Sequence, residues 1–215
     1  MKQGLVEMVF ILDCSGSMYR LANDTIGGYN SMIEKQKKEP GEAFVTTVLF
    51  NDEYKLLHDH VNLKDIGTIS GKEYSPSGMT ALLDAIGRTI NSIGARLAAT
   101  PEEERPEKVM FMVTTDGMEN ASKEFTYATV KEMIEHQQNK YNWVFIFLGA
   151  NIDAVGEAEK LGIRKDFARN YTNSDKGVGT VYAATSNVMS KARGKSYATL
   201  DAMSADVAKD LDSVE

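Results

Sequence analysis

The chain contains little cysteine and no long apolar run. Its one cysteine, Cys14, excludes an intramolecular disulfide framework and a zinc site built from several cysteines. No stretch approaches the roughly 20 apolar residues that a membrane-spanning helix needs. The longest early apolar run, residues 8–12, is too short for the core of a secretory signal and lacks a small-residue cleavage site. We therefore expect a cytoplasmic protein that does not insert into a membrane.

The chain also lacks a cluster of positive charge, and its acidic residues outnumber its basic ones. The 215 residues include 24 Lys and Arg against 31 Asp and Glu, for a formal net charge of −7, and the basic residues form no run. Nucleic acids and anionic membrane surfaces bind clustered positive charge, so neither is expected as the main partner. The apolar fraction of 42% and the charged fraction of 26% are typical of a globular protein that buries its own core.

Strands and helices alternate along most of the sequence. Apolar runs bounded by polar turns predict strands at residues 6–12, 43–50, 53–59, 108–114, 143–148 and 166–170. Apolar residues at spacings of three and four predict helices at 24–38, 81–99, around 130–137, at 155–161 and at 178–192. This alternation favours an α/β fold, with a mostly parallel sheet covered by helices on both faces. The Asn51-Asp52 turn indicates a hairpin, which supplies one antiparallel strand at an edge.

The packed domain is expected to end where Gly194 terminates the last core helix. This divides the chain into a domain at 1–193 and a C-terminal tail at 194–215. From residue 198 onward, the tail places apolar residues on one stripe of a short amphipathic helix. The stripe contains Leu200, Met203, Val207 and Leu211. Such a helix is too short to be stable alone in water, so it either docks on its own domain or binds another chain. We favour docking.

Three loops bring oxygen-bearing side chains to the positions where a parallel sheet binds ligands. Asp13, Ser15 and Ser17 follow the first strand, Thr80 precedes a helix, and Asp116 follows the fourth strand. In doubly wound sheets, ligands bind beyond the carboxyl ends of the strands. Two carboxylates and three hydroxyls suit a hard divalent cation, and Mg²⁺ or Mn²⁺ fits better than Ca²⁺, which prefers more carboxylates.

These residues resemble a known family. Asp-x-Ser-x-Ser at 13–17, the threonine of Gly-Met-Thr-Ala-Leu at 78–82 and Thr-Asp-Gly at 115–117 are similar to the metal-ion-dependent adhesion site (MIDAS) of von Willebrand factor A (vWA) domains. The order, spacing and strand placement of all three segments match, and the resemblance covers about residues 5–193. It implies a Rossmann-like, doubly wound sheet of six strands in the order 3-2-1-4-5-6.

The resemblance also implies roles for the residues. Ser15, Ser17 and Thr80 would bind the metal directly, whereas Asp13 and Asp116 would act largely through water or as alternating ligands. It further implies binding rather than catalysis, with an Asp or Glu of a protein partner completing the coordination of the metal. Members of the intracellular bacterial or phage type often work within larger assemblies.

Other interpretations remain open at this point. Any one of these Ser or Asp residues alone is more often a helix cap than a ligand. Cys14 and Arg20 satisfy Cys-x5-Arg and resemble the phosphate loop of tyrosine phosphatases, although the adjacent Asp13 disfavours the thiolate that this chemistry needs. Leu21, where a Ser or Thr is usual, is a further departure.

Metal-dependent phosphoryl transfer or hydrolysis is a further alternative. Phosphoryl transfer to Asp13, in the manner of haloacid dehalogenases, usually involves a second Asp two residues later, where this chain has Ser15. A metal-dependent hydrolase would need a general base, for which Glu119 and Asp24 are the nearest candidates in the sequence.

Methionines accompany the three loops. Met18 follows Ser17, Met79 precedes Thr80, and Met118 lies two residues after Asp116. If these side chains point outward, they form a soft apolar ring around the metal, because thioethers adapt to varied surfaces. We expect partner contacts from this ring and from neighbouring side chains, namely Met18, Tyr19, Met79, Met118 and Glu119. The alternative is that some of the methionines turn inward and pack beneath their loops.

Two histidines form a weaker candidate site. His58 and His60 are two residues apart on a predicted strand and are expected to share a face, as half of a zinc site would require. The sequence offers no evident third ligand, so we favour two polar residues on an edge strand.

Overall fold

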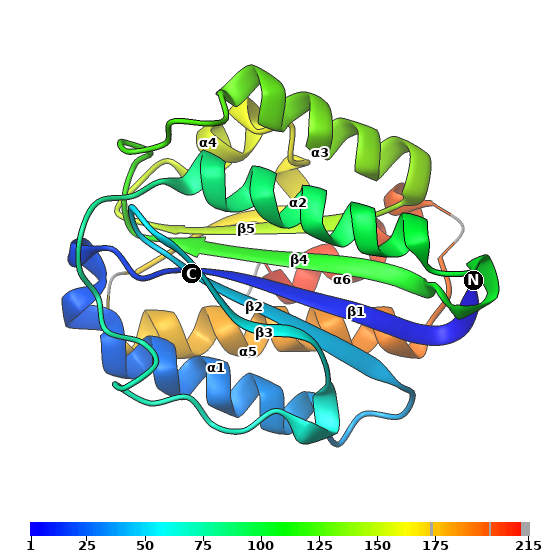
Figure 1. The fold of residues 1–215 in the computed structure, drawn as a ribbon. Helices are drawn as coiled ribbons and strands as arrows, with labels where there is room; N and C mark the ends of the chain where they lie inside the picture. Colours follow the sequence, from blue (N-terminus) through cyan, green and yellow to red (C-terminus); the bar gives the residue numbers. More distant parts are fainter. Residues whose placement is uncertain (173, 198, 212–215) are drawn as a thin grey trace.

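A six-stranded sheet crosses the middle of the molecule in the computed structural model, which describes residues 1–172, 174–197 and 199–211 (Figure 1). The strand order β3-β2-β1-β4-β5-β6 is the predicted one, and β3 pairs antiparallel to β2 at the edge. The strands are β1 (Lys2–Asp13), β2 (Ala43–Phe50), β3 (Tyr54–Asn62), β4 (Pro106–Thr115), β5 (Val144–Ala150) and β6 (Ala168–Tyr171).

Helices cover both faces of the sheet. One face carries α1 (Ala22–Gln36) and α5 (Asp175–Gly194), and the other carries α2 (Leu82–Ala99), α3 (Tyr127–Tyr141) and α4 (Ala154–Lys160). Successive residues of β1 enter opposite cores: Phe10 packs with α1 and α5, whereas Ile11 packs with α2 and α3. This double burial explains why the central strands are almost continuously apolar. None of the helices within the described ranges is both long and apolar enough to cross a membrane.

The carboxyl ends of β1 and β4 lie side by side at the left end of the sheet in Figure 1. The two strands are parallel, and Leu12 pairs with Thr114 in their register. The next residue of each strand, Asp13 and Thr115, therefore reaches the same edge. The strand order reverses at this pair, with β2 and β3 on one side and β5 and β6 on the other. This is the position at which doubly wound sheets bind ligands.

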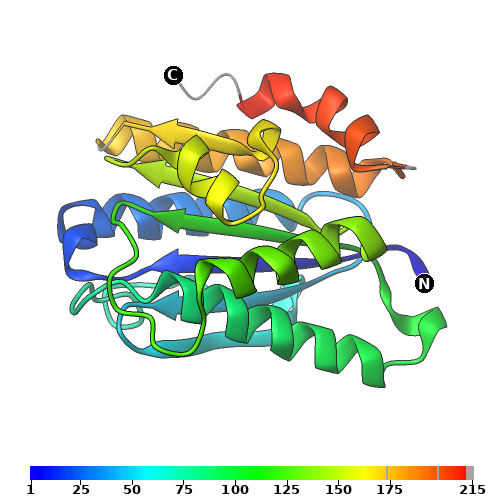
Figure 2. The ribbon, with the colours of Figure 1, turned by 90° about the horizontal axis from the view of Figure 1, so that it is seen from above.

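The tail docks on the domain through helix α6 (Leu200–Leu211), which packs against α5 and the short helix η4 (Lys165–Phe167) (Figure 2). Two ion pairs also join α5 and the residue that follows it to α6: Lys191–Asp210 at 2.6 Å and Lys195–Asp206 at 2.8 Å. The predicted apolar stripe is buried in the core that α1 and α5 share, and it consists of Leu200, Met203, Val207 and Leu211. Docking is thus the correct alternative. The boundary at residue 193 stays a prediction, and positions 198 and 212–215 lie outside the described residues.

The expectation that His58 and His60 share a face is wrong. The pairing of β3 with β2 shifts register on either side of Thr47, and His60 adopts a left-handed backbone conformation with φ 52°. This irregularity breaks the two-residue alternation of the strand. His58 Nδ1 lies 3.4 Å from the Tyr29 hydroxyl on the α1 face, whereas His60 Nδ1 lies 2.6 Å from Glu7 on the α2 face. The two imidazoles therefore cannot bind one metal together.

Burial of the α6 stripe predicts a stability cost for its loss. Met203→Ala should lower the free energy of unfolding by about 2–3 kcal/mol, because the substitution removes a buried side chain and leaves a cavity. Ala205→Ser, on the exposed side of the same helix, should change it by less than about 0.5 kcal/mol. Urea denaturation measures both values, and equal effects of the two variants would contradict the docked position of α6.

Candidate metal centre

Three loops at the carboxyl edge of the sheet hold the five predicted ligands. The first contains the short helix η1 (Gly16–Leu21) after β1, the second leads into α2, and the third follows β4. Backbone hydrogen bonds join the loops: Gly16 N donates to Gly78 O at 3.1 Å, and Asn120 N donates to Thr80 O at 3.0 Å. Ser17 is exposed, and the other four side chains are buried at this edge, namely Asp13, Ser15, Thr80 and Asp116.

Asp13 is fully buried, and protein groups occupy both of its carboxylate oxygens. Oδ1 accepts a hydrogen bond from Ser15 N at 2.7 Å, and Oδ2 accepts one from Thr115 Oγ1 at 2.6 Å. These contacts tie the first loop and the end of β4 to the end of β1. A carboxylate engaged in this way is suited to positioning neighbouring ligands or a bound water.

The two serine hydroxyls and Asp116 form a chain of short contacts. Ser15 Oγ lies 3.0 Å from Ser17 Oγ, and Ser17 Oγ donates a hydrogen bond to Asp116 Oδ1 at 2.5 Å. The structure thus brings together side chains that are about 100 positions apart in the sequence. Each of these oxygens has lone pairs that a cation among them would use.

Thr80 reaches the same place from the second loop, and Gly117 leaves room beside it. A Cβ on Gly117 would lie 3.3 Å from Thr80 Oγ1 and 3.5 Å from Ser17 Oγ. These two hydroxyls from different loops therefore face a common space that the glycine keeps free of side-chain atoms. The amide of Asn120 holds the threonine backbone, because its Oδ1 accepts from Thr80 N at 2.9 Å.

Burial raises the pKa of both carboxyl groups. For Asp13, desolvation is the largest cause, hydrogen bonds from Ser15 and Thr115 oppose it, and the charge of Asp116 adds to it. For Asp116, desolvation again dominates and the hydrogen bond from Ser17 opposes it. Two partly desolvated carboxyls that repel each other favour a positive charge between them, because a nearby cation stabilises both ionised forms.

The donor set fits a hard divalent cation. It consists of three hydroxyls and two carboxylates, and oxygen ligands of this kind suit Mg²⁺ and Mn²⁺. Over the described parts of the chain, no group of three or more His, Cys, Asp and Glu side chains is placed to hold a metal. The imidazole and thiolate ligands preferred by structural zinc sites are therefore not assembled there.

Two supporting residues were not recognised as such in the sequence. Thr115 Oγ1 bonds to Asp13 and accepts from Gly117 N at 3.1 Å, so it connects two loops. The buried hydroxyl of Tyr74 donates to the backbone carbonyl of Asp13 from behind the site. Thr115 is the first residue of the Thr-Asp-Gly motif, whereas Tyr74 lies in a long irregular segment whose path no local pattern predicts.

Of the predicted partner contacts, Tyr19, Met79 and Met118 are exposed, to 77%, 55% and 63%. The expectation for Met18 is wrong, because its side chain is 1% exposed in the core beneath the first loop. The turn of η1 points it inward and its neighbour Tyr19 outward. A ring of three methionines therefore does not exist.

Glu119 has a structural role that the sequence did not suggest. Its carboxylate accepts hydrogen bonds from Leu83 N at 3.0 Å, Ala121 N at 2.9 Å and Ser122 N at 2.7 Å. It therefore fastens the third loop to the first turn of α2 and is not available as a free carboxylate at the surface. A partner contact at Glu119 stays a prediction.

The geometry at Cys14 does not resemble a phosphate loop. The thiol belongs to the apolar core, and burial raises its pKa, which disfavours the thiolate. Arg20 is exposed, two residues beyond the buried Met18. A phosphate loop would require the sulfur and the guanidinium to converge on one anion.

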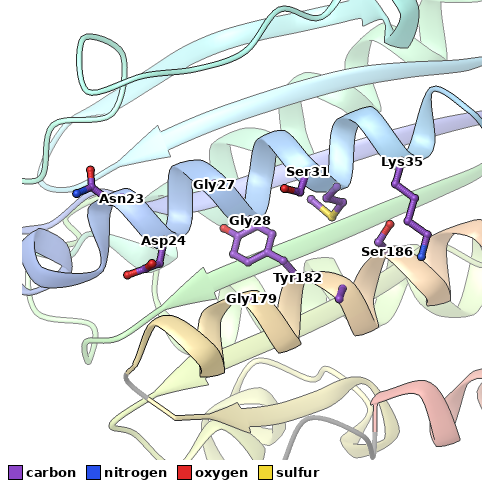
Figure 3. A pocket seen from close by; sticks show the side chains of 11 residues that line it. Asn23, Asp24, Gly27, Gly28, Ser31, Lys35, Gly179, Tyr182 and Ser186 are labelled. Atoms are coloured by element: carbon purple, nitrogen blue, oxygen red, sulfur yellow. The ribbon is translucent and has the colours of Figure 1, made fainter.

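Two hollows lie away from the metal loops. One, of about 330 Å³, runs between α1 and α5 and is lined by Gly28, Tyr182 and Ser186 among others (Figure 3). Another, of about 590 Å³, lies near the amino ends of the strands beside Trp143 and Tyr141. Neither is lined by any of the five predicted ligands. The oxygen cluster thus lies at an edge formed by loops and outside both hollows.

No family model and no curated protein sequence matches this chain. Solved structures do match. Proximal thread matrix protein 1 from the mussel byssus superposes with a TM-score of 0.62 at 18% identity, over 87% of this chain and 46% of that one. A form of that protein with a zinc-occupied MIDAS motif gives 0.56 at 16% identity, over 86% and 46%.

A third match is the vWF domain of the type V pili tip protein Mfa5 from Porphyromonas gingivalis. It gives a TM-score of 0.61 at 10% identity and covers 90% of this chain and 98% of that domain. The chain therefore has the fold of vWA domains, as the three motifs indicated. It spans about half the length of the mussel protein, and identities this low establish the fold alone.

The space beside Gly117 predicts that a methyl group there weakens metal binding. Gly117→Ala should fold normally but lose at least half of the rise in Tm that saturating Mg²⁺ gives the wild type, because the new Cβ faces Thr80 Oγ1 and Ser17 Oγ. Differential scanning fluorimetry with and without Mg²⁺ measures this rise. Gly94→Ala, where a Cβ on α2 meets nothing within 4 Å, is the matched control and should retain the full gain. An undiminished gain in Gly117→Ala would place the metal elsewhere.

The hydrogen bond from Tyr74 predicts a smaller effect. Tyr74→Phe should weaken Mg²⁺ binding about threefold to tenfold, since the first loop loses a contact worth about 1 kcal/mol. Tyr29→Phe removes a comparable buried hydroxyl that bonds to Thr47 at 2.8 Å on β2. It should lower stability to a similar extent and leave the metal affinity unchanged. Isothermal titration distinguishes the two variants, and equal affinities would show that Tyr74 does not position the site.

Proposed function

We propose that this chain is a protein-binding module that uses a divalent cation to capture an acidic residue of its partner. The observation that carries the proposal is the convergence of five oxygen-bearing side chains from three loops on the carboxyl edge of the sheet, around a space kept open by Gly117. The zinc-occupied MIDAS motif in a structure with the same fold supports a divalent cation at this edge.

Ser15, Ser17 and Thr80 would hold the cation directly, and Asp13 and Asp116 would balance its charge and orient bound water. The cation supplies a positive charge and a coordination position that a carboxylate oxygen can fill. The protein needs this charge, because a net charge of −7 repels an acidic partner at long range. The same net charge favours a protein partner over a nucleic acid.

Mg²⁺ is the proposed cation, with Mn²⁺ as its close substitute. Both accept hydroxyl, carboxylate and water oxygens in octahedral geometry, whereas Ca²⁺ usually takes six to eight ligands with more carboxylates. Zinc in the mussel protein belongs to that protein, and its usual nitrogen and sulfur ligands are not among the five side chains proposed here.

We propose binding rather than catalysis because Glu119, one of the two candidate general bases in the sequence, is engaged in internal hydrogen bonds. A general base needs a free oxygen within hydrogen-bonding distance of the proton that it removes. The oxygens of Glu119 instead accept hydrogen bonds from the backbone of the third loop and of α2. We further propose that the chain works in the cytoplasm as part of a larger assembly.

Metal binding is tested by thermal stability. At about 100 times its dissociation constant, a cation that binds only the folded state adds about 2.7 kcal/mol. For a chain of this length, that corresponds to a rise in Tm of roughly 5–10 °C. Thr80→Val, which replaces the hydroxyl by a methyl group of similar size, and Asp116→Ala should lose most of the rise. Thr129→Val, at an exposed hydroxyl on α3, should keep it.

Identical Mg²⁺ responses in the wild type, Thr80→Val and Asp116→Ala would refute the metal site. Partner binding is then tested by pull-down from the native cell in Mg²⁺ and in EDTA. Proteins retained by the wild type in Mg²⁺ should be lost in EDTA and in the Thr80→Val variant. If the same proteins are retained in EDTA and by the Thr80→Val variant, metal-dependent capture is excluded. Phosphatase activity abolished by Cys14→Ser would support the enzymatic alternative instead.

A further inference from the structure

Exposed apolar side chains gather on the loops of the metal centre. Among the described residues, only four large apolar side chains are more than half exposed, and three of them are Tyr19, Met79 and Met118. Each lies one or two positions from a predicted ligand, and each comes from a different loop. Single exposed apolar residues are ordinary, but a group of them at one place marks a surface that binds something.

Neighbouring contacts fix the outward orientation of Tyr19 and Met79. Tyr19 lies in η1 between Met18 and Leu21, whose side chains are both buried. Met79 N donates to Asp52 Oδ1 at 3.0 Å, and the next residue, Thr80, is buried. The buried neighbours thus occupy the inward-facing positions of both loops, and the side chains of Tyr19 and Met79 are left facing outward.

Met118 is fixed in the same way on the third loop. Gly117, on one side, donates its N–H to Thr115 Oγ1 at 3.1 Å. Glu119, on the other side, binds the backbone of Leu83 at 3.0 Å. The apolar side chain between these two anchors therefore remains at the surface of the loop that carries Asp116.

We propose that Tyr19, Met79 and Met118 form an apolar rim around the cation, and that this rim selects an acidic residue flanked by large apolar side chains. The inference rests on the proposed function, because the cation anchors the carboxylate. A charged residue alone would satisfy the metal and leave the three apolar side chains in water. Apolar neighbours on the partner would cover them and exclude water from the metal–carboxylate contact, which strengthens that contact.

The composition of the rim suits a range of apolar neighbours. Methionine side chains are flexible and polarisable, so Met79 and Met118 can adapt to leucine, isoleucine or phenylalanine. Tyr19 has few rotatable bonds and loses little conformational entropy when it is covered. The partner segment is thus defined by its chemistry as one carboxylate between two bulky apolar residues.

Three fluorescently labelled synthetic peptides test the rim on the full chain in Mg²⁺. Their central sequences are Leu-Asp-Leu, Ser-Asp-Ser and Leu-Asn-Leu, each with the same polar flanks, and fluorescence anisotropy measures their affinities. The Leu-Asp-Leu peptide should bind about tenfold more tightly than Ser-Asp-Ser. The Leu-Asn-Leu peptide, and Leu-Asp-Leu in EDTA, should show no specific binding.

Substitutions then test which residues cause the preference for Leu-Asp-Leu over Ser-Asp-Ser. In the double variant Met79→Ser with Met118→Ser, and in Tyr19→Ser, the tenfold preference should fall to about threefold or less. The rise in Tm with Mg²⁺ should not change, because these side chains are not ligands. Tyr141→Ser removes an aromatic side chain of 49% exposure at the end of α3, near the opposite edge of the sheet. It should retain the full preference.

The outcomes separate this inference from the proposed function. Equal metal-dependent binding of both aspartate peptides would overturn the rim and leave metal-dependent capture intact. Binding of Leu-Asn-Leu as tight as that of Leu-Asp-Leu would also overturn it, because apolar contact alone would then suffice. Failure of both aspartate peptides to bind in Mg²⁺ would overturn the rim together with carboxylate capture. A preference that persists in the rim variants would assign the selectivity to other residues.

Discussion

The buried carboxylate of Asp13 is the constraint on which the candidate metal centre depends. It lies at the end of the central strand β1, and burial makes it costly unless both oxygens are bonded. Ser15 N and Thr115 Oγ1 provide those bonds, so the first loop and the end of β4 have to take the positions they occupy. Satisfying one charge thereby fixes the relative placement of two of the three loops.

Two further acidic residues join the third loop to α2. Asp84, in the first turn of the helix, accepts from the backbone N–H groups of Lys123 and Phe125, at 2.9 and 3.0 Å. Glu119 makes the reciprocal contact: it lies in the third loop, and its carboxylate accepts a hydrogen bond from Leu83 N of the helix. Because each segment binds the other, the loops that supply Thr80 and Asp116 are held together before any cation binds. A centre organised in this way spends little binding energy on ordering its own ligands.

Local patterns were sufficient for the fold because they repeat over whole elements. The apolar runs of the central strands and the spacing of three and four in α2 reflect burial on a whole face, which a single sequence records directly. Three motifs that agreed in order and spacing also marked the five candidate ligands, and the structure brings these side chains to one edge of the sheet. Their role as metal ligands stays a prediction. Single side chains were less predictable. The two-residue alternation expected for His58 and His60 failed because a register shift at Thr47 has no signal of its own.

The sequence by itself determined the elements and the residue types that gather at the carboxyl edge of the sheet, whereas the order of the strands followed from the resemblance of three motifs to vWA domains. Only the tertiary structure decided which neighbours face inward, placing Met18 in the core and leaving Tyr19, Met79 and Met118 exposed. It also directed the carboxylate of Glu119, in the third loop, to the backbone at the start of α2. The physical reason is that periodicity follows from the helix and the strand alone, whereas the direction of a loop side chain depends on hydrogen bonds to distant segments.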